Sequence, residues 1–391
     1  MELLRNSIEI NRNRLYSDKD LSQIDDFILL KGNKLIIRNN DVEFKFRQDS
    51  NFFWISGINE PDYSIYINCY QKKIILIPPK FDDLYPVWHG KLPNIQNIKD
   101  TLAFDDIKYD TKESIHTELL LKKIQQYRVI KNNYEIQLMK KACDISQTAH
   151  NYLIENIQQF ISKKEKVIAN KFIQLTENED NVDGQAYASI CACGSNGAIL
   201  HYTDNYTELK KGELFLIDAG CEYLNYASDI TRTYGIGEIN IQKKKLIELV
   251  SNINTKCKLI VKQNTDFKDI HNLCMDLVYE AIIELDILND EGKKKDKDLI
   301  SKIFMPHGLG HFIGLDVHDV GGRLYNKLTG DSIILKENMV ITIEPGIYFN
   351  KFLLNKYKDL WNENINTYIN IGGVRIEDVV VVKKYNYEQL N

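Results

Sequence analysis

The sequence contains no long apolar run. A helix that crosses a bilayer needs roughly 20 predominantly apolar residues, and no stretch of the 391 residues meets that requirement. The opening stretch, MELLRNSIEINRNRL, breaks its apolar residues with Arg and Asn within each turn, so it lacks the apolar core of a signal peptide. We therefore expect a cytoplasmic protein that does not associate with membranes.

The chain also lacks an excess of basic residues and a regular set of cysteines. Its net charge is -5 with both signs well mixed, which offers no basic face for nucleic acid. The seven cysteines are scattered and odd in number, which favours reduced thiols. Cys191 and Cys193 alternate in the apolar stretch ASICACG. They could form a metal pair, but we expect them to be small core side chains.

The apolar residues, 43% of the total, are sufficient for a large core. In the first third, IYINCY and KKIILIPP predict short strands of an α/β domain over residues 1–127. Next, Asn132 and Glu135 have the spacing of a capping box. Five apolar residues then recur at helical intervals and predict a long helix: Ile136, Met139, Cys143, Leu153 and Ile157. This helix opens a second domain, residues 128–391, in which helices alternate with strands.

The fold class predicted by this organisation is α/β (α+β) with two domains. The strands of the second domain include ELFLIDAG, MVITIEP and GVRIEDVVVV. Within it, the mixed charge run DEGKKKDKDL, residues 290–299, predicts a solvated loop without function.

Two aspartates interrupt the apolar strands of LIDAGCEYLNYASDITRTYG. A simple hairpin here turns between Tyr223 and Leu224. Asp218 and Asp229 would then face each other, with Cβ atoms roughly 4.5–5.5 Å apart, where like charges are destabilising. Shared protonation, a basic side chain or a metal cation could neutralise them. The commoner arrangement is that one aspartate caps a loop and the other pairs with Arg232.

Two glutamates occupy comparable positions in later strands. In NMVITIEPGIYF, Glu344 ends a strand that reads as buried, immediately before Pro345. In GGVRIEDVVVV, strand alternation places Arg375 and Glu377 on one face. Each carboxylate alone could be an ordinary ion pair, but four of them in strands favour a common site.

Three histidines lie in PHGLGHFIGLDVHDVGG: His307, His311 and His318. The first two have the spacing of a helical metal site, but the glycines between them disfavour a helix. We predict an extended segment in which the glycines let the backbone approach closely. A lone histidine there is usually structural, whereas three together favour a functional site.

The four carboxylates and one of these histidines form an oxygen-rich ligand set without a thiolate. Two divalent cations would cancel the four negative charges and allow the two aspartates to lie face to face. Such ligands suit Mn²⁺ best, and Co²⁺, Fe²⁺ or Zn²⁺ with less discrimination. Two metals roughly 3.5–4 Å apart can hold a hydroxide nucleophile and polarise a carbonyl. The predicted chemistry is hydrolysis of an acyl bond.

These motifs resemble a known family, the pita-bread metallopeptidases, and within it aminopeptidase P and prolidase. The resemblance rests on DAG, SDITRT, HGLGHFIGLDVHDVGG, EPGIY and GGVRIEDVV, and RNNDVEFKFRQDSNFFWISGINEPD resembles the N-terminal domain of aminopeptidase P. It implies an N-terminal aminopeptidase P-type domain, a C-terminal pita-bread catalytic domain, and assembly into a homodimer or homotetramer.

The resemblance also implies roles for single residues. The implied metal ligands are Asp218, Asp229, His311, Glu344 and Glu377, with Asp229 and Glu377 bridging the two metals. Glu344 would also manage the proton of the attacking water. His201, in AILHYTDN, matches the family's substrate histidine, and an ordinary loop histidine is the alternative. His318 matches a second histidine that hydrogen-bonds the scissile carbonyl or the tetrahedral intermediate.

Four further residues match positions around the substrate. His307, Tyr348 and Arg375 match residues that line or support the cleft. Trp88, in PVWHGKL, resembles an aromatic of the first domain that reaches the cleft of a neighbouring subunit. Packing in the core is the alternative for Trp88.

The implied substrates are proline-containing peptides, cleaved before the proline. Proline lacks an amide N–H and has a fixed φ, so peptidases that bind extended strands reject it. We predict an Xaa-Pro aminopeptidase, with prolidase as the alternative. Dipeptide-specific prolidases usually carry an arginine at the position of Gly330, whereas Arg323 and Lys327 are displaced from it. Methionine aminopeptidases lack this kind of first domain, and non-catalytic pita-bread binding modules have lost ligands.

Overall fold

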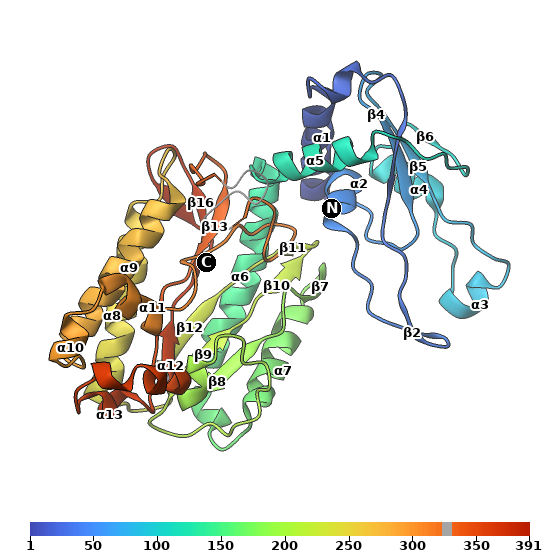
Figure 1. Ribbon diagram of the computed structural model, residues 1–391. Coiled ribbons are helices and arrows are strands. Elements are labelled where there is room, and N and C mark those ends of the chain that lie inside the picture. The colour runs from blue at the N-terminus through green and yellow to red at the C-terminus, as the bar shows by residue number, and fades with distance from the viewer. Residues whose placement is uncertain (323–330) are drawn as a thin grey trace. The chain divides into compact units, whose positions relative to one another are not determined.

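The computed structural model of the chain describes residues 1–322 and 331–391 (Figure 1). The chain forms two compact units, Met1–Glu135 and Ile136–Asn391. The domain boundary expected after residue 127 falls within α5, Thr117–Arg128. That residues 1–127 and 128–391 are separate domains stays a prediction.

A four-stranded sheet with the order β1-β4-β5-β6 lies at the centre of the first unit. The two apolar runs predicted as strands are β4 and β5, which pair antiparallel. The strands of this unit are β1 (Ile28–Lys31), β2 (Ile37–Asn39), β3 (Val42–Glu43), β4 (Ser64–Asn68), β5 (Lys73–Ile77) and β6 (Asp106–Ile107). Its other elements besides α5 are α1 (Glu2–Tyr16), η1 (Leu21–Gln23), α2 (Ser50–Ser56), α3 (Tyr85–His89) and α4 (Ile95–Thr101).

The predicted long helix is α6, Asn133–Glu155, and it begins with the predicted capping box. Asn132 Oδ1 accepts a hydrogen bond from the Glu135 N–H at 3.0 Å, and Glu135 Oε2 accepts one from the Asn132 N–H at 2.8 Å. The apolar positions that predicted the helix are all buried. Ile157 lies just beyond the helix, in the 3₁₀ turn η2, Ile157–Phe160.

The strands of the second unit lie between two groups of helices (Figure 1). On one side α7 packs against β8, and on the other α8 packs against β13 and β15 and is covered by α9. The helical elements are α7 (Glu165–Glu177), η3 (Gly194–Ala198), α8 (Ile241–Leu259), α9 (Phe267–Glu284), α10 (Asp290–Lys293), α11 (Lys297–Phe304), α12 (Lys351–Lys356), η4 (Lys358–Leu360) and α13 (Ile365–Tyr368). Within the described ranges, no helix is both long and apolar enough to cross a membrane.

The strands of this unit form several short antiparallel groups, with the orders β11-β10-β7, β12-β9-β8, β13-β16-β17 and β14-β15. Their bounds are β7 (Val182–Gln185), β8 (Ile190–Cys193), β9 (Leu214–Asp218), β10 (Cys221–Tyr223), β11 (Tyr226–Ala227), β12 (Thr231–Gly235), β13 (Val340–Ile343), β14 (Gly346–Tyr348), β15 (Gly373–Arg375), β16 (Asp378–Val382) and β17 (Tyr387–Gln389). Asp229, Glu344 and Glu377 each lie in a short gap between two successive strands.

The hairpin that carries the two aspartates turns one residue later than predicted. Tyr223 pairs with Tyr226. Leu224 and Asn225 between them have φ values of 46° and 64°, which is the geometry of a two-residue type I′ turn. Asn tolerates a positive φ better than most residues, and its position fixes where the chain reverses.

This register separates the two aspartates from direct opposition. Asp218 pairs with Thr231, and Asp229 lies two residues before Thr231, so the predicted direct pairing is wrong. Arg232 forms an ion pair with Asp378 at 3.0 Å. The alternative in which Arg232 neutralises one of the two aspartates is therefore wrong as well.

An opposed pair of acidic residues does occur, between Glu344 and Glu377. Ile343 pairs with Asp378 on one side of them, and Gly346 pairs with Arg375 on the other. The shared register places the two glutamates opposite each other across an interruption in the strand pairing. Pro345 has no amide hydrogen and cannot continue the hydrogen-bond ladder there.

Cys191 and Cys193 lie in β8 and belong to an apolar core cluster with Phe172 and Phe215. Their expected role as small core side chains is confirmed. All seven cysteines of the chain are buried free thiols. The charge run 290–299 is largely exposed as expected, but it contains α10 and the start of α11, so the predicted loop is wrong.

Candidate metal centre

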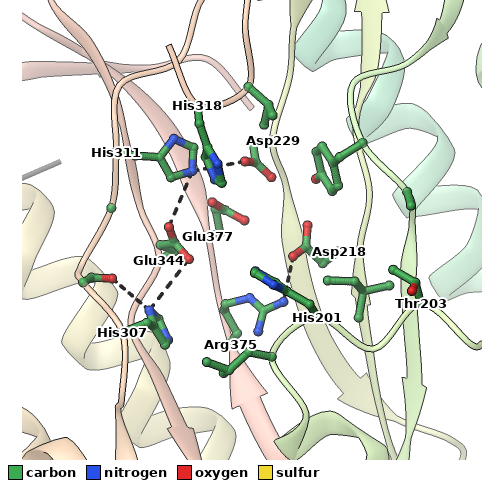
Figure 2. Close-up of a pocket in the computed structure, with 17 residues that line it drawn as sticks. His201, Thr203, Asp218, Asp229, His307, His311, His318, Glu344, Arg375 and Glu377 are labelled. Atoms are coloured by element: carbon green, nitrogen blue, oxygen red, sulfur yellow. Dashed lines mark hydrogen bonds and ion pairs between the residues drawn. The ribbon is translucent and has the colours of Figure 1, made fainter. Parts of the chain in front are cut away.

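A cavity of about 300 Å³ in the second unit brings together nine of the eleven residues predicted for the site. They are His201, Asp218, Asp229, His307, His311, His318, Glu344, Arg375 and Glu377. His201 comes from one side of the cavity, whereas the three other histidines come from the segment on the opposite side (Figure 2). Residues distant in sequence therefore share one site.

The remaining two predicted residues lie elsewhere. Tyr348 is fully buried and is not among the residues that line the cavity, so of the two predicted positions it has the supporting one. Trp88 lies in α3 of the first unit with 71% of its surface exposed. The alternative that Trp88 packs in the core is therefore wrong.

The predicted ligands converge closely. Single donor atoms of Asp229, His311 and Glu377 all lie within 4.8 Å of one another. His311 Nε2 lies 3.4 Å from Asp229 Oδ2 and 3.6 Å from Glu344 Oε1. Asp229, His311 and Glu377 are each at most 5% exposed. This grouping concentrates negative charge where water cannot screen it.

The imidazole of His311 presents a lone pair to these carboxylates. Its Nδ1 lies 3.0 Å from the Phe312 carbonyl oxygen, which can only accept, so Nδ1 carries the hydrogen in the neutral ring. Nε2 then has a lone pair and no hydrogen, and it faces carboxylate oxygens of Asp229 and Glu344 that also carry lone pairs. A cation between these atoms would convert mutual repulsion into coordination, and the Nδ1 contact would hold the ring in the ligating tautomer.

Asp218 supplies a second observation that fits a cation. Its Oδ2 accepts a hydrogen bond from Arg375 Nη2 at 2.7 Å. Its Oδ1 is buried and has no hydrogen-bond partner among the residues that the structure describes. A buried carboxylate oxygen without a partner is costly, and a metal ion would satisfy it. Oxygen donors with a single imidazole therefore fit divalent metal ions.

The cluster shifts the pKa values of its carboxyl groups. Burial and the neighbouring Asp218 raise the pKa of Asp229 well above its ordinary value. Burial and then Asp229 do the same to the pKa of Glu377. Burial, together with Glu377, raises the pKa of Glu344 to about 8. In the metal-free protein the cluster therefore retains protons at pH values where isolated carboxyl groups are ionised.

A hydrogen-bonded chain supports the cavity wall. Arg375 Nη1 donates to the Tyr348 hydroxyl at 3.1 Å, and that hydroxyl lies 2.8 Å from His307 Nε2. His307 Nδ1 lies 2.8 Å from the Gly308 carbonyl oxygen, so Nδ1 donates and Nε2 accepts from Tyr348. This chain orients His307 toward Glu344, whose Oε2 is 4.0 Å from Nδ1.

Two glycines allow the backbone to approach the ligand-bearing strands. A Cβ atom on Gly310 would lie 2.0 Å from the Thr342 carbonyl oxygen, and one on Gly220 would lie 2.0 Å from the Ser228 carbonyl oxygen. His311 follows Gly310 in an extended segment that contains no helix. The predicted glycine-dependent approach is confirmed at Gly310, whereas a Cβ atom on Gly308 would meet nothing within 4 Å.

Sequence reasoning missed three residues that hold the ligands. Thr231 Oγ1 donates to Glu377 Oε2 at 2.7 Å. The Tyr187 hydroxyl hydrogen-bonds Asp229. Asn254 of α8 donates through its side-chain amide to the Ile343 and Ile376 carbonyl oxygens, at 3.0 Å and 3.2 Å. Thr231 lies within the SDITRT motif, but the other two contacts span long sequence separations that no local pattern indicates.

Comparisons with known proteins agree with this site. Residues 137–384 match the model of metallopeptidase family M24, and residues 9–129 match the aminopeptidase P N-terminal domain. A probable Xaa-Pro aminopeptidase of Aspergillus clavatus is 32% identical over 412 residues, covering 91% of this chain and 87% of the relative. A probable Xaa-Pro aminopeptidase of Botryotinia fuckeliana is 33% identical over 410 residues, with the same coverage of 91% and 87%.

Solved structures show the same fold. Aminopeptidase P from E. coli superposes with a TM-score of 0.81 at 23% identity, covering 99% of this chain and 94% of that one. Proline aminopeptidase P II from Yersinia pestis gives a TM-score of 0.78 at 22% identity, with coverage of 99% and 95%. The match to the family model and the relatives above 30% identity establish that the chain belongs to metallopeptidase family M24.

Proposed function

We propose that this chain is a dinuclear-metal Xaa-Pro aminopeptidase, which releases the N-terminal residue from peptides with proline in second position. The observation that carries the proposal is the convergence of four carboxylates and the His311 lone pair in one cavity. The relatives named as probable Xaa-Pro aminopeptidases, similar over about nine tenths of this chain, support the reaction.

The residues that would hold the metal ions in this proposal are Asp218, Asp229, His311, Glu344 and Glu377, and Asp229 and Glu377 would be shared between the two ions. Two divalent ions, Mn²⁺ before Co²⁺, Fe²⁺ or Zn²⁺, suit such oxygen-rich donors. When bound, they would supply Lewis-acid polarisation of the scissile carbonyl and an activated water.

The remaining polar residues of the cavity bind the substrate and manage protons. His201 and His318 are exposed on opposite sides of the cavity (Figure 2), where their ring nitrogens can hydrogen-bond the peptide backbone and the developing oxyanion. Glu344 faces both the cavity and the ligand cluster. In this proposal its carboxylate would take a proton from the attacking water and deliver it to the leaving nitrogen.

The cavity wall also contains the apolar surface that a proline ring needs. Ile190, Leu200 and Val317 line it together with the Tyr187 ring. A preformed apolar wall suits a residue whose nitrogen offers no hydrogen bond. We assign the recognition of the substrate ring to this surface.

We further propose a cytoplasmic homodimer or homotetramer. The free state of every cysteine supports a reducing compartment. The exposed Trp88, with Leu84 and Val87 also exposed in and beside α3, supports a contact with a neighbouring subunit. Trp88 would then complete the substrate cleft of its neighbour.

Hydrolysis of a matched pair of peptides, with Mn²⁺ added, tests the proposal. One peptide is an Xaa-Pro dipeptide and the other is the same dipeptide extended by two residues, with an Xaa-Ala version of each as control. Preference for the extended Xaa-Pro peptide supports an aminopeptidase. Cleavage of the dipeptide alone would instead assign a prolidase; Arg323, Lys327 and Gly330, which bear on that choice, lie outside the described residues.

The same assay separates two other classes. Cleavage of Met-Ala peptides without cleavage of Xaa-Pro peptides would indicate a methionine aminopeptidase. A protein that neither contains metal when purified nor gains activity when metal is added would indicate a non-catalytic binding module.

A further inference from the structure

The segment that carries His201 has little regular structure of its own. It runs from the end of β8 through η3 to Thr207 and places Leu200, His201 and Thr203 in the cavity wall. A loop that positions a substrate-contacting histidine must be held from outside, because backbone that is not in a helix or strand lacks repeating hydrogen bonds.

One buried carboxylate ties both ends of this segment together. Glu165, the first residue of α7, accepts hydrogen bonds at Oε1 from the Cys193 N–H at 2.7 Å and from Asn196 Nδ2 at 3.1 Å. Its Oε2 accepts from the Tyr202 hydroxyl and from the Thr207 N–H, both at 2.8 Å. The four donors span the segment on both sides of His201.

This arrangement suits a side chain with two acceptor oxygens. Glu165 is completely buried, and a carboxylate accepts hydrogen bonds at both oxygens without donating any. Its position in the first turn of α7 adds the favourable field of the helix N-terminus. A neutral amide of the same size would direct an N–H₂ group at two of the donors.

Other contacts also hold the segment, including a hydrogen bond from Asn196 Nδ2 to Thr207 Oγ1 at 2.8 Å. Asn205 accepts from the Cys191 N–H and donates to the Ser189 carbonyl oxygen, both at 2.8 Å. Asn350 donates to the Ala198 carbonyl oxygen at 3.0 Å. Glu165 differs from these residues because it accepts from four donors on both sides of His201, and one of them is Tyr202, the neighbour of His201.

We propose that Glu165 is a positioning residue that fixes the segment 193–207 and thereby sets the place of His201 in the substrate cavity. Its effect on catalysis rests on the proposed function, whereas its effect on the segment does not. Among the described residues, Glu165 neither lines the cavity nor contacts a proposed metal ligand. Its influence on substrate must therefore pass through the segment.

A double-mutant cycle tests the catalytic part. Glu165→Gln should lower kcat/KM for an Xaa-Pro peptide by about tenfold or more, because small misplacements of substrate-positioning groups are costly. In a protein that already carries His201→Ala, the same substitution should lower kcat/KM much less, because the histidine that Glu165 positions is absent. If the fold loss of kcat/KM in the double variant equals the product of the losses in the two single variants, the proposal that Glu165 acts through His201 is overturned.

Two variants provide controls. Tyr202→Phe removes only one of the four donors and should give a smaller loss in the same direction, which keeps the test available if Glu165→Gln does not fold. Glu177→Gln changes an exposed glutamate at the other end of α7 and should leave kcat/KM unchanged. Full activity of Glu165→Gln with normal substrate affinity would contradict the proposal.

Amide hydrogen exchange tests the structural part independently of activity. Glu165→Gln should accelerate exchange within residues 193–207 while α9, which is remote from Glu165 in the contacts of the described unit, keeps its protection. Unchanged exchange in the segment would overturn the inference. If the wild-type protein cleaves no Xaa-Pro peptide, the proposed function fails, but this exchange measurement still decides whether Glu165 holds the segment.

Discussion

His311 shows how a local contact determines chemistry at the scale of a residue. Nδ1 of His311 donates a hydrogen bond to the Phe312 carbonyl oxygen. Nε2 therefore carries no hydrogen and directs its lone pair toward Asp229 and Glu344. The four carboxylates could be predicted to share a site because Asp and Glu interrupt strands that otherwise exclude charge, whereas the choice of His311 among three histidines rested on the family resemblance. Thr231 and Tyr187 could not be predicted as supports of these carboxylates, because hydroxyl groups are common in both strands and loops and give no such signal.

Glu377→Ala should abolish peptidase activity and lower the metal content per chain. The substitution removes one of three groups whose donor atoms lie within 4.8 Å of one another, and Glu377 is a metal ligand under the proposed function. Metal analysis by mass spectrometry, together with the peptide assay, checks both effects. Full activity or an unchanged metal content would refute the two-metal site.

His318→Ala should leave metal content unchanged and lower kcat, by about 10²-fold if the histidine stabilises an oxyanion. Its ring packs edge-on against His311, with ring centroids 4.3 Å apart, but it is not one of the three close ligands. Loss of metal in this variant would show that the roles of the two histidines are reversed.

At the scale of elements, the interrupted strands are the main feature. β13 and β14 continue in one register opposite β16 and β15, and Glu344 and Glu377 occupy the interruption. The strands themselves could be predicted from alternation and from β-branched residues. The type I′ turn could not, because it needs a positive φ at Leu224 as well as at Asn225, and leucine rarely adopts one. The residue opposite Glu344 could not either, because it belongs to a strand pairing between distant segments.

Asn254→Leu should destabilise this interruption. The substitution leaves the Ile343 and Ile376 carbonyl oxygens without their side-chain donor, and one buried unsatisfied group costs about 1–3 kcal/mol. Urea unfolding should show a lower free energy of unfolding, and titration should show weaker metal binding. Asn252→Leu, at an exposed position of the same helix, is the matched control and should change neither quantity.

At the scale of the whole molecule, the acidic cluster links stability to pH. Glu344 has a pKa of about 8 in the folded protein against an ordinary value of 4.5. Between these values the folded, metal-free protein holds a proton that the unfolded chain releases. The free energy of unfolding should therefore fall as pH rises through this window, and the raised pKa values of Asp229 and Glu377 act in the same direction.

Thermal unfolding of the chelator-treated protein across this pH range measures the effect. The Tm should decrease as pH rises, and saturating Mn²⁺ should restore it most strongly at the upper end, where the ionised carboxylates bind metal. Glu344→Gln should flatten the slope. A Tm that rises with pH in the absence of metal would contradict the coupling.

Assembly is the second expectation at this scale. We expect a dimer or tetramer, with Trp88 at a contact between subunits, and light scattering of the purified protein measures the mass directly. Trp88→Ala should reduce activity on longer peptides or shift the mass toward one chain. A wild-type protein with the mass of a single chain would rule out the assembly.

The close approaches at Gly220 and Gly310 affect how the chain can evolve. Any side chain at either position would collide with a carbonyl oxygen 2.0 Å away, next to strands that hold metal ligands. In a complete survey of substitutions, these two positions should tolerate change as poorly as the ligands, although neither has a functional group. The positions that tolerate no substitution would therefore surround the active site, but they would include residues that take no part in its chemistry.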